Sequence, residues 1–202
     1  MLADVLRRKG KVNLLGPKAI SVTEQGEPDG WEIKAGFDGQ TAQDGSNRLL
    51  VSVPTEQLLT VHSALMGLLG SNVGVLYRQF IDRRNPGPNN APPTDFVGLD
   101  LSKERVAGAL SAAKDLIYHD ARCELWLRGE MGDQVILDRD GLIYCYPDDP
   151  AFRDLLSQFD LMEGEIEVLL ERDYVRHLFH SQNDVIEDSF IENLGLSRIG
   201  GQ

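Results

Sequence analysis

The sequence predicts a single α+β domain over residues 1–202, with helices packed on one face of a mostly antiparallel sheet. Three observations predict it: short apolar or alternating runs between turn residues, amphipathic stretches with helix caps, and a strand–helix–strand order that occurs twice. The chain is 42% hydrophobic and 26% charged. That composition is typical of a globular protein whose core needs neither disulfides nor a metal.

The N-terminal part, residues 1–53, is predicted to be strand-rich. Glycine and proline supply turns at residues 16–17 and 26–30. Residues 38–47 contain Ala42 as their one apolar residue, so we expect them to form a mobile loop. Strands are expected at residues 12–15, 19–23, 31–35 and 49–53.

Two strand–helix–strand units follow. In the first, Pro54 and Thr55 open a helix with one apolar face, and Gly70 ends it. In the second, Ser102 is a good N-cap for a helix whose apolar face extends to Ile117. The flanking strands are expected at 49–53 and 73–81 in the first unit, and at 96–99 and 123–128 in the second.

A proline-rich loop over residues 85–94 separates the two units, because four prolines in ten residues exclude both a helix and a strand ladder. The repeated order predicts an internal duplication with a ferredoxin-like tendency. The sequence similarity between the two units is no greater than that between any two aligned amphipathic helices. The shared order of strand, helix and strand is therefore the stronger argument.

Residues 121–146 are predicted to form a three-stranded meander. Residues 134–137 and 142–146 read as strands, and the residues between them, with Asp138 and Gly141, favour a hairpin turn. Asp138 and Asp140 also match the start of a calcium loop or a metal–nucleotide motif, but the turn explains them better, since apolar residues stand where further ligands would be needed.

The last quarter contains two helices and one ambiguous segment. Asp149 followed by Pro150 marks a helix start, and that helix should run to about residue 159. Residues 165–171 alternate as a half-buried strand would, although their apolar residues also fit a helix, and both alternatives stay open.

The final helix has the clearest signals. Ser181 and Asp184 match a capping box, and Gly195 provides a stop. Three apolar residues share its predicted inner face: Ile186, Phe190 and Leu194.

Charge is distributed unevenly along the chain. The formal net charge is −12, and residues 148–192 hold 13 acidic against 3 basic side chains. Such a field repels phosphate backbones, so we expect no nucleic-acid partner, whereas it favours encounter with a basic protein. The alternative is that these acids only keep an acidic, bacterial-like protein in solution.

The two cysteines, Cys123 and Cys145, are too few and too far apart for a disulfide framework or a CxxC metal site. Both are expected to be buried free thiols. The first residues do not resemble a secretory signal, and no stretch reaches the roughly 20 apolar residues of a membrane span. We therefore expect a cytoplasmic protein with no membrane partner.

No catalytic motif, phosphate-binding loop or cofactor motif is found, so we expect no catalytic residue and no cofactor. His177 and His180 are weak candidates for a metal, because a native site needs more ligands than these two. His119, four residues before Cys123, adds no recognisable ligand spacing.

The sequence predicts a non-catalytic cytoplasmic protein that binds a protein partner through an acidic surface, as an immunity protein, antitoxin, chaperone or adaptor does. The first alternative is a metal-assisted enzyme that uses His177, His180 and nearby carboxylates. The second is a structural subunit of a homo-oligomer, with the loop 85–94 as a docking arm. The partner-binding residues expected for the first hypothesis are Glu163, Glu165, Glu167, Glu171 and Asp173.

Overall fold

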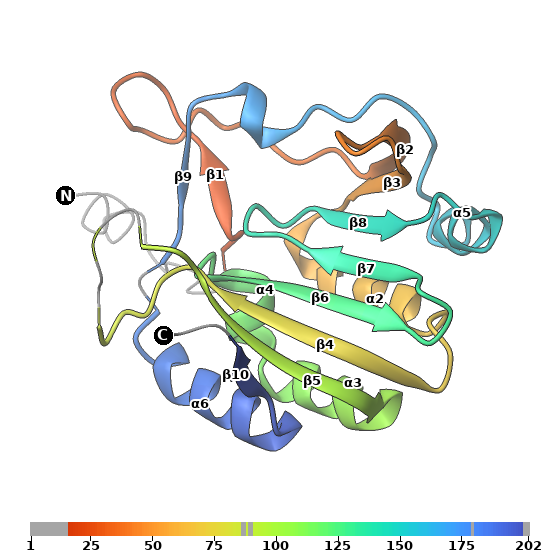
Figure 1. Ribbon diagram of the computed structural model, residues 1–202. Coiled ribbons are helices and arrows are strands. Elements are labelled where there is room, and N and C mark those ends of the chain that lie inside the picture. The colour runs from red at the N-terminus through yellow and green to blue at the C-terminus, as the bar shows by residue number, and fades with distance from the viewer. Residues whose placement is uncertain (1–15, 86–87, 89–90, 179, 200–202) are drawn as a thin grey trace.

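The computed structural model describes residues 16–85, 88, 91–178 and 180–199. They form an eight-stranded antiparallel sheet, a separate two-stranded sheet and five α-helices, which confirms the α+β class (Figure 1). The strands are β1 (Ala19–Ser21), β2 (Gly36–Thr41), β3 (Asn47–Ser52), β4 (Asn72–Gln79), β5 (Thr94–Ser102), β6 (Cys123–Gly129), β7 (Gln134–Leu137), β8 (Ile143–Tyr146), β9 (Tyr174–Arg176) and β10 (Ser197–Ile199). The helices are α2 (Thr55–Met66), α3 (Lys103–Ala112), α4 (Lys114–His119), α5 (Pro150–Ser157) and α6 (Asn183–Leu194), with a short 3₁₀ helix η1 (Leu169–Glu171).

The strand order of the large sheet is β10-β5-β4-β6-β7-β8-β3-β2, and each neighbouring pair is antiparallel. Side chains alternate across a strand, so Val75 and Tyr77 of β4 enter the core while Leu76 and Arg78 face away. The helices cover the core face (Figure 1). The opposite face, which we call the open face, is covered only in part.

Both predicted strand–helix–strand units are present, but they are not arranged alike. β3 and β4, which α2 joins, have three strands between them in the sheet. β5 and β6, which α3 and α4 join, have β4 alone between them. The ferredoxin-like tendency therefore stays unconfirmed. The three-stranded meander β6-β7-β8 is confirmed, with its turn closed by Asp138, whose Oδ1 accepts from the backbone N–H groups of Asp140 and Leu142.

Two predictions in the N-terminal part are wrong. Residues 31–35 form no strand, and residues 38–41 of the expected loop belong to β2. The reason is non-local: β2 pairs along its length with β3, and Phe37 anchors it in the core with 3% of its side chain exposed. The loop shrinks to residues 42–46, where Gly45 adopts a positive φ of 84°. The strand expected at residues 12–15 lies outside the described residues.

Several helix signals behave as predicted, but the stop expected at Gly70 is wrong, because α2 ends at Met66 with Gly67 as its C-cap. The Ser102 side chain accepts from the N–H of Arg105, and that of Asp149 accepts from the N–H of Ala151. Gly195 ends α6 in the left-handed conformation, with a φ of 64°. The Ser181 capping box is wrong, because α6 begins two residues later and no side chain caps it.

The ambiguous segment, residues 165–171, is neither a regular strand nor an α-helix. It is an extended chain that ends in η1, and it crosses one end of the open face, where Ile166 packs on Leu50 and Leu142. Beyond it lies β9, which was not expected and which pairs with β1. Within the described residues, no helix is both long enough and apolar enough to cross a bilayer. Cys123 and Cys145 are buried free thiols, as expected.

Candidate functional site

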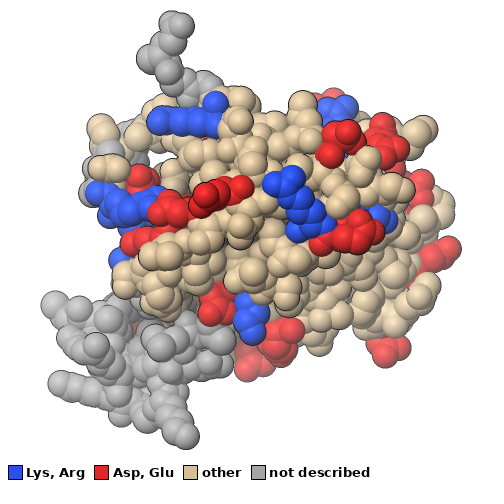
Figure 2. Space-filling view, turned by 90° about the horizontal axis from the view of Figure 1, so that it is seen from below, with Lys and Arg blue, Asp and Glu red and all other residues tan. Residues whose placement is uncertain are grey.

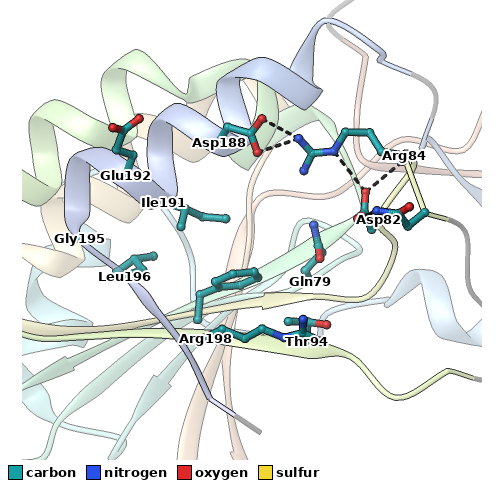
Figure 3. A pocket seen from close by; sticks show the side chains of 12 residues that line it. Gln79, Asp82, Arg84, Thr94, Asp188, Ile191, Glu192, Gly195, Leu196 and Arg198 are labelled. Carbon is teal, nitrogen blue, oxygen red and sulfur yellow. Dashed lines mark hydrogen bonds and ion pairs between the residues drawn. The ribbon is translucent and has the colours of Figure 1, made fainter. Parts of the chain in front are cut away.

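A hollow of about 710 Å³ lies between α6 and the sheet edge formed by β5 and β10 (Figure 3). Its floor is apolar and is formed by Phe96, Ile191 and Leu196. Charged and amide side chains surround this floor. They come from the end of β4, the loop after it, α6 and β10: Gln79, Asp82, Arg84, Asn85, Asp188, Glu192 and Arg198.

Arg84 forms one wall of this hollow and is held on both sides. Its Nη1 lies 2.7 and 2.6 Å from the two carboxylate oxygens of Asp188, and its Nε lies 3.4 Å from Oδ1 of Asp82 (Figure 3). These bonds tie the β4–β5 connection to α6. They also neutralise the guanidinium, so this wall offers little net positive charge to an anion.

Beneath the hollow lies a buried ionic cluster centred on Arg122, whose side chain is fully buried. Its guanidinium lies 2.9 Å from Asp120, 2.7 Å from Asp184 and 3.3 Å from Glu187. Asp120 and Glu187 are also fully buried. An unpaired ion would be very costly at this depth, so the three carboxylates and the arginine must be retained together.

Glu187 joins this cluster to the sheet. Its Oε1 accepts from the Tyr77 hydroxyl at 2.5 Å and from the Gln79 amide at 2.9 Å. Burial raises the pKa of Tyr77, and the neighbouring Cys123 and Glu187 act in the same direction, so the phenol is a donor and not a base. The cluster fastens α6 to β4 and β6, and its buried carboxylates are not presented to solvent.

Burial also shifts the pKa values of the Cys123 thiol and of two histidines. Burial raises the pKa of Cys123 to about 11, which leaves it a thiol at neutral pH. Burial lowers the pKa of both His177 and His180. His177 donates from Nδ1 to the carbonyl of Pro17 at 2.8 Å, so it serves to position the chain before β1. Among the described residues no three His, Cys, Asp or Glu side chains are grouped to hold a metal.

The five predicted partner-binding residues lie far from the hollow. Their segment runs along the top of the molecule in Figure 1, whereas α6 lies at the bottom, so the acidic last quarter is divided between two places. The face seen in Figure 2 carries acidic and basic side chains interspersed. The segment is fixed on β2, since the N–H of Phe37 donates to the carbonyl of Met162 and that of Gly164 donates to the carbonyl of Phe37.

The five carboxylates differ in their surroundings. Glu163 pairs with Arg153 at 2.7 Å, and Glu167 pairs with Arg172 at 2.7 Å. The Arg172 bond is the main cause that lowers the pKa of Glu167. Glu165, Glu171 and Asp173 are exposed and make no ion pair with a described basic residue.

Two exposed apolar side chains of this segment were missed by the sequence reasoning. Met162 is 76% exposed and Leu170 is 58% exposed, while Ile166 and Leu169 between them are buried. A regular strand or a regular helix would place Leu170 on the same face as Ile166. The irregular backbone instead buries Ile166 and exposes Leu170, and no local sequence pattern predicts this difference.

Comparison with known protein families, curated proteins and solved structures gave no match to this chain. The site must therefore be interpreted from its own geometry. The residues of the hollow were also missed, because they come from β4, β5, α6 and β10 and share no motif.

Proposed function

We propose that this chain is a non-catalytic cytoplasmic binding protein that uses the acidic segment 162–173 to bind a basic protein partner. The observation that carries the proposal is the combination of exposed carboxylates with two exposed large apolar side chains on a backbone that is firmly anchored. Charges at the rim of an interface steer the encounter, and buried apolar side chains supply most of the affinity.

The anchoring supports a binding role because it lowers the entropy lost on association. Ile166 and Leu169 fasten the segment to the body. Glu163 pairs with Arg153 of α5, and Arg172, which also pairs with Glu167 inside the segment, pairs with Asp29 outside it at 3.0 Å. Glu165, Leu170 and Glu171 are then presented in one conformation. The partner chemistry that fits them is a surface with lysine or arginine around an apolar centre.

The test compares two charge-reversed variants that change net charge equally. Glu165→Lys with Glu171→Lys alters the segment, and Glu56→Lys with Glu104→Lys alters exposed positions on α2 and α3. Both proteins are used as bait in lysate of the source cells. We expect the first variant to lose the captured partner and the second to retain it.

A third variant, Leu170→Ser, separates the apolar contribution from the charge. It should weaken capture without changing its salt dependence, whereas capture by the wild type should fall as salt rises. Equal capture by the wild type and the two segment variants would show that the partner binds elsewhere.

A further inference from the structure

A second hollow, of about 470 Å³, lies on the open face at the end of the sheet away from β9. Two rings line it, those of Trp126 on β6 and Tyr146 on β8, together with Ile136 of β7 and Pro147. Strand register explains this arrangement, since Trp126 pairs with Ile136 and Gln134 pairs with Tyr146. The polar rim consists of Asp44, Ser46, Asn47 and Gln134.

Both rings are held in place before any ligand arrives. The indole N–H of Trp126 donates to Glu124 at 3.3 Å, and the Arg78 guanidinium stacks 5.4 Å from the ring centre. The Tyr146 hydroxyl accepts from Arg48 at 2.9 Å. A preformed aromatic hollow loses little entropy when it is filled.

Rigid aromatic rings beside a proline, with a polar rim, suit a polyproline segment. Such a segment has no internal hydrogen bonds, is already extended and places its rings on aromatic side chains while its carbonyls accept hydrogen bonds. The amides of Gln134 and Asn47 can donate to those carbonyls. A charged ligand fits less well, because Asp44 on the rim and Arg48 behind Tyr146 have opposite signs.

The chain itself carries a segment of this chemistry. Ala91, Pro92 and Pro93 are exposed, lie outside every helix and strand, and directly precede β5. Each of the first two residues is followed by proline, which restricts it to extended conformations. The segment is uncharged and bears the small, rigid rings that the hollow can accommodate.

This segment is too far from its own hollow to fill it. It precedes β5, whereas the hollow extends from Trp126 on β6 to Tyr146 on β8. β8 lies four strands from β5 in the sheet, which is roughly 19 Å at about 4.8 Å per strand, and Trp126 lies two strands across from β5 and pairs with Leu76, three residues along β4 from Gln79. We propose that residues 91–93 of one copy dock in the Trp126–Tyr146 hollow of a second copy.

A reciprocal exchange would place two such contacts in one symmetric dimer, and each contact would raise the effective concentration for the other. We therefore expect a concentration-dependent dimer in light scattering coupled to size exclusion. Trp126→Ala and the pair Pro92→Ala with Pro93→Ala should each give monomers, whereas Pro88→Ala, an exposed proline in the same connection, should still dimerise.

Two further measurements distinguish a variant that is misfolded from one that has lost only the contact between residues 91–93 and the Trp126–Tyr146 hollow. Mixing the Trp126→Ala protein with the Pro92→Ala, Pro93→Ala protein pairs one intact segment with one intact hollow and should restore heterodimers. The capped peptide Asn-Asn-Ala-Pro-Pro-Thr-Asp should quench or shift Trp126 fluorescence in a Trp31→Phe background, and its double-alanine analogue should not. A monomer at every concentration would overturn the proposal even if the peptide binds, as would a dimer that survives both variants.

Discussion

The buried cluster around Arg122 predicts a large and specific loss of stability when its cation is removed. Arg122→Met keeps the length of the side chain but leaves Asp120 and Glu187, both fully buried, without their guanidinium. Two unit charges about 4 Å apart attract by about 4 kcal/mol at an effective dielectric constant of about 20. Breaking a buried pair by removing one partner costs about 3–5 kcal/mol.

The assay is urea unfolding followed by circular dichroism, with the slope compared between variants so that a change in stability is not confused with a change in the unfolded state. A loss of about 3–5 kcal/mol lowers the midpoint of thermal unfolding by about 6–20 °C in a protein of this size. The matched control is Arg128→Met on β6, whose side chain is exposed and which should change stability by less than about 0.5 kcal/mol.

The double variant Arg122→Met with Glu187→Gln tests the physical cause. Glu187→Gln removes one of the stranded charges and keeps an oxygen for the hydrogen bonds from Tyr77 and Gln79. The double variant should therefore lose less stability than the sum of the single variants. Strict additivity, or a loss below about 1 kcal/mol for Arg122→Met, would refute the idea that this arginine compensates the buried carboxylates.

Three further predictions concern the pH dependence of stability and the substitution of closely packed glycines. Burial raises the pKa of Asp138 from 3.8 to about 6. The stability of the folded protein that depends on the protonated Asp138 is therefore fully present below about pH 4 and is lost as pH rises through 6. Asp138→Asn should be more stable than the wild type above pH 6, by about 2–3 kcal/mol, and equal to it below pH 4. Burial lowers the pKa of His62 from 6.5 to about 3, so the folded protein loses stability as pH falls below 6.5. His62→Gln should lose less stability than the wild type between pH 6.5 and 4.5, as measured by the midpoint of urea unfolding at each pH. Gly129→Ala should cost about 1–3 kcal/mol because a Cβ there would lie 2.5 Å from the carbonyl oxygen of Leu69, whereas Gly108→Ala in α3 meets nothing within 4 Å and should stabilise by about 0.5–1 kcal/mol. Equal effects at the two glycines in thermal unfolding would contradict this account.

The features predicted well are those that short stretches of chain determine. A strand was expected at residues 123–128, and in β6 the alternating Cys123, Leu125 and Leu127 face the core while Trp126 faces the other side. Asp149 before Pro150 caps a helix through its own backbone neighbours. In each case the interacting groups lie within a few residues of one another, so a local pattern contains the information.

β2 shows where local reasoning fails. Its sequence, Gly-Phe-Asp-Gly-Gln-Thr, has two glycines and little apolar character, and it carries the signals of a loop. It is nevertheless a strand because β3 supplies a hydrogen-bonding edge and the core accommodates Phe37. Strand propensity depends on what lies alongside, and the partner strand is specified elsewhere in the chain.

The cluster around Arg122 could not be found for a related reason. Charged residues are expected at the surface unless they are paired, and pairing is not visible in one sequence. Asp120 and Arg122 are two residues apart in the chain, but Glu187 reaches them only after α6 returns to the sheet. The functional hypotheses gave these residues no role, and their burial now explains why they are unavailable to a partner.

Folding also limits the electrostatic effect that the acidic residues among 148–192 have on a partner. A count along the chain treats residues 148–192 as one source of field, but screening confines the effect of an exposed charge to about 8 Å at physiological salt. Folding sends α6 to one end of the molecule and the segment 162–173 to the other, and Arg153 and Arg172 neutralise two of its carboxylates. Three exposed carboxylates remain there: Glu165, Glu171 and Asp173. In the proposed complex, steering by so few charges would be modest and most of the affinity would come from Met162 and Leu170, so removal of Leu170 should weaken binding more than removal of any single carboxylate.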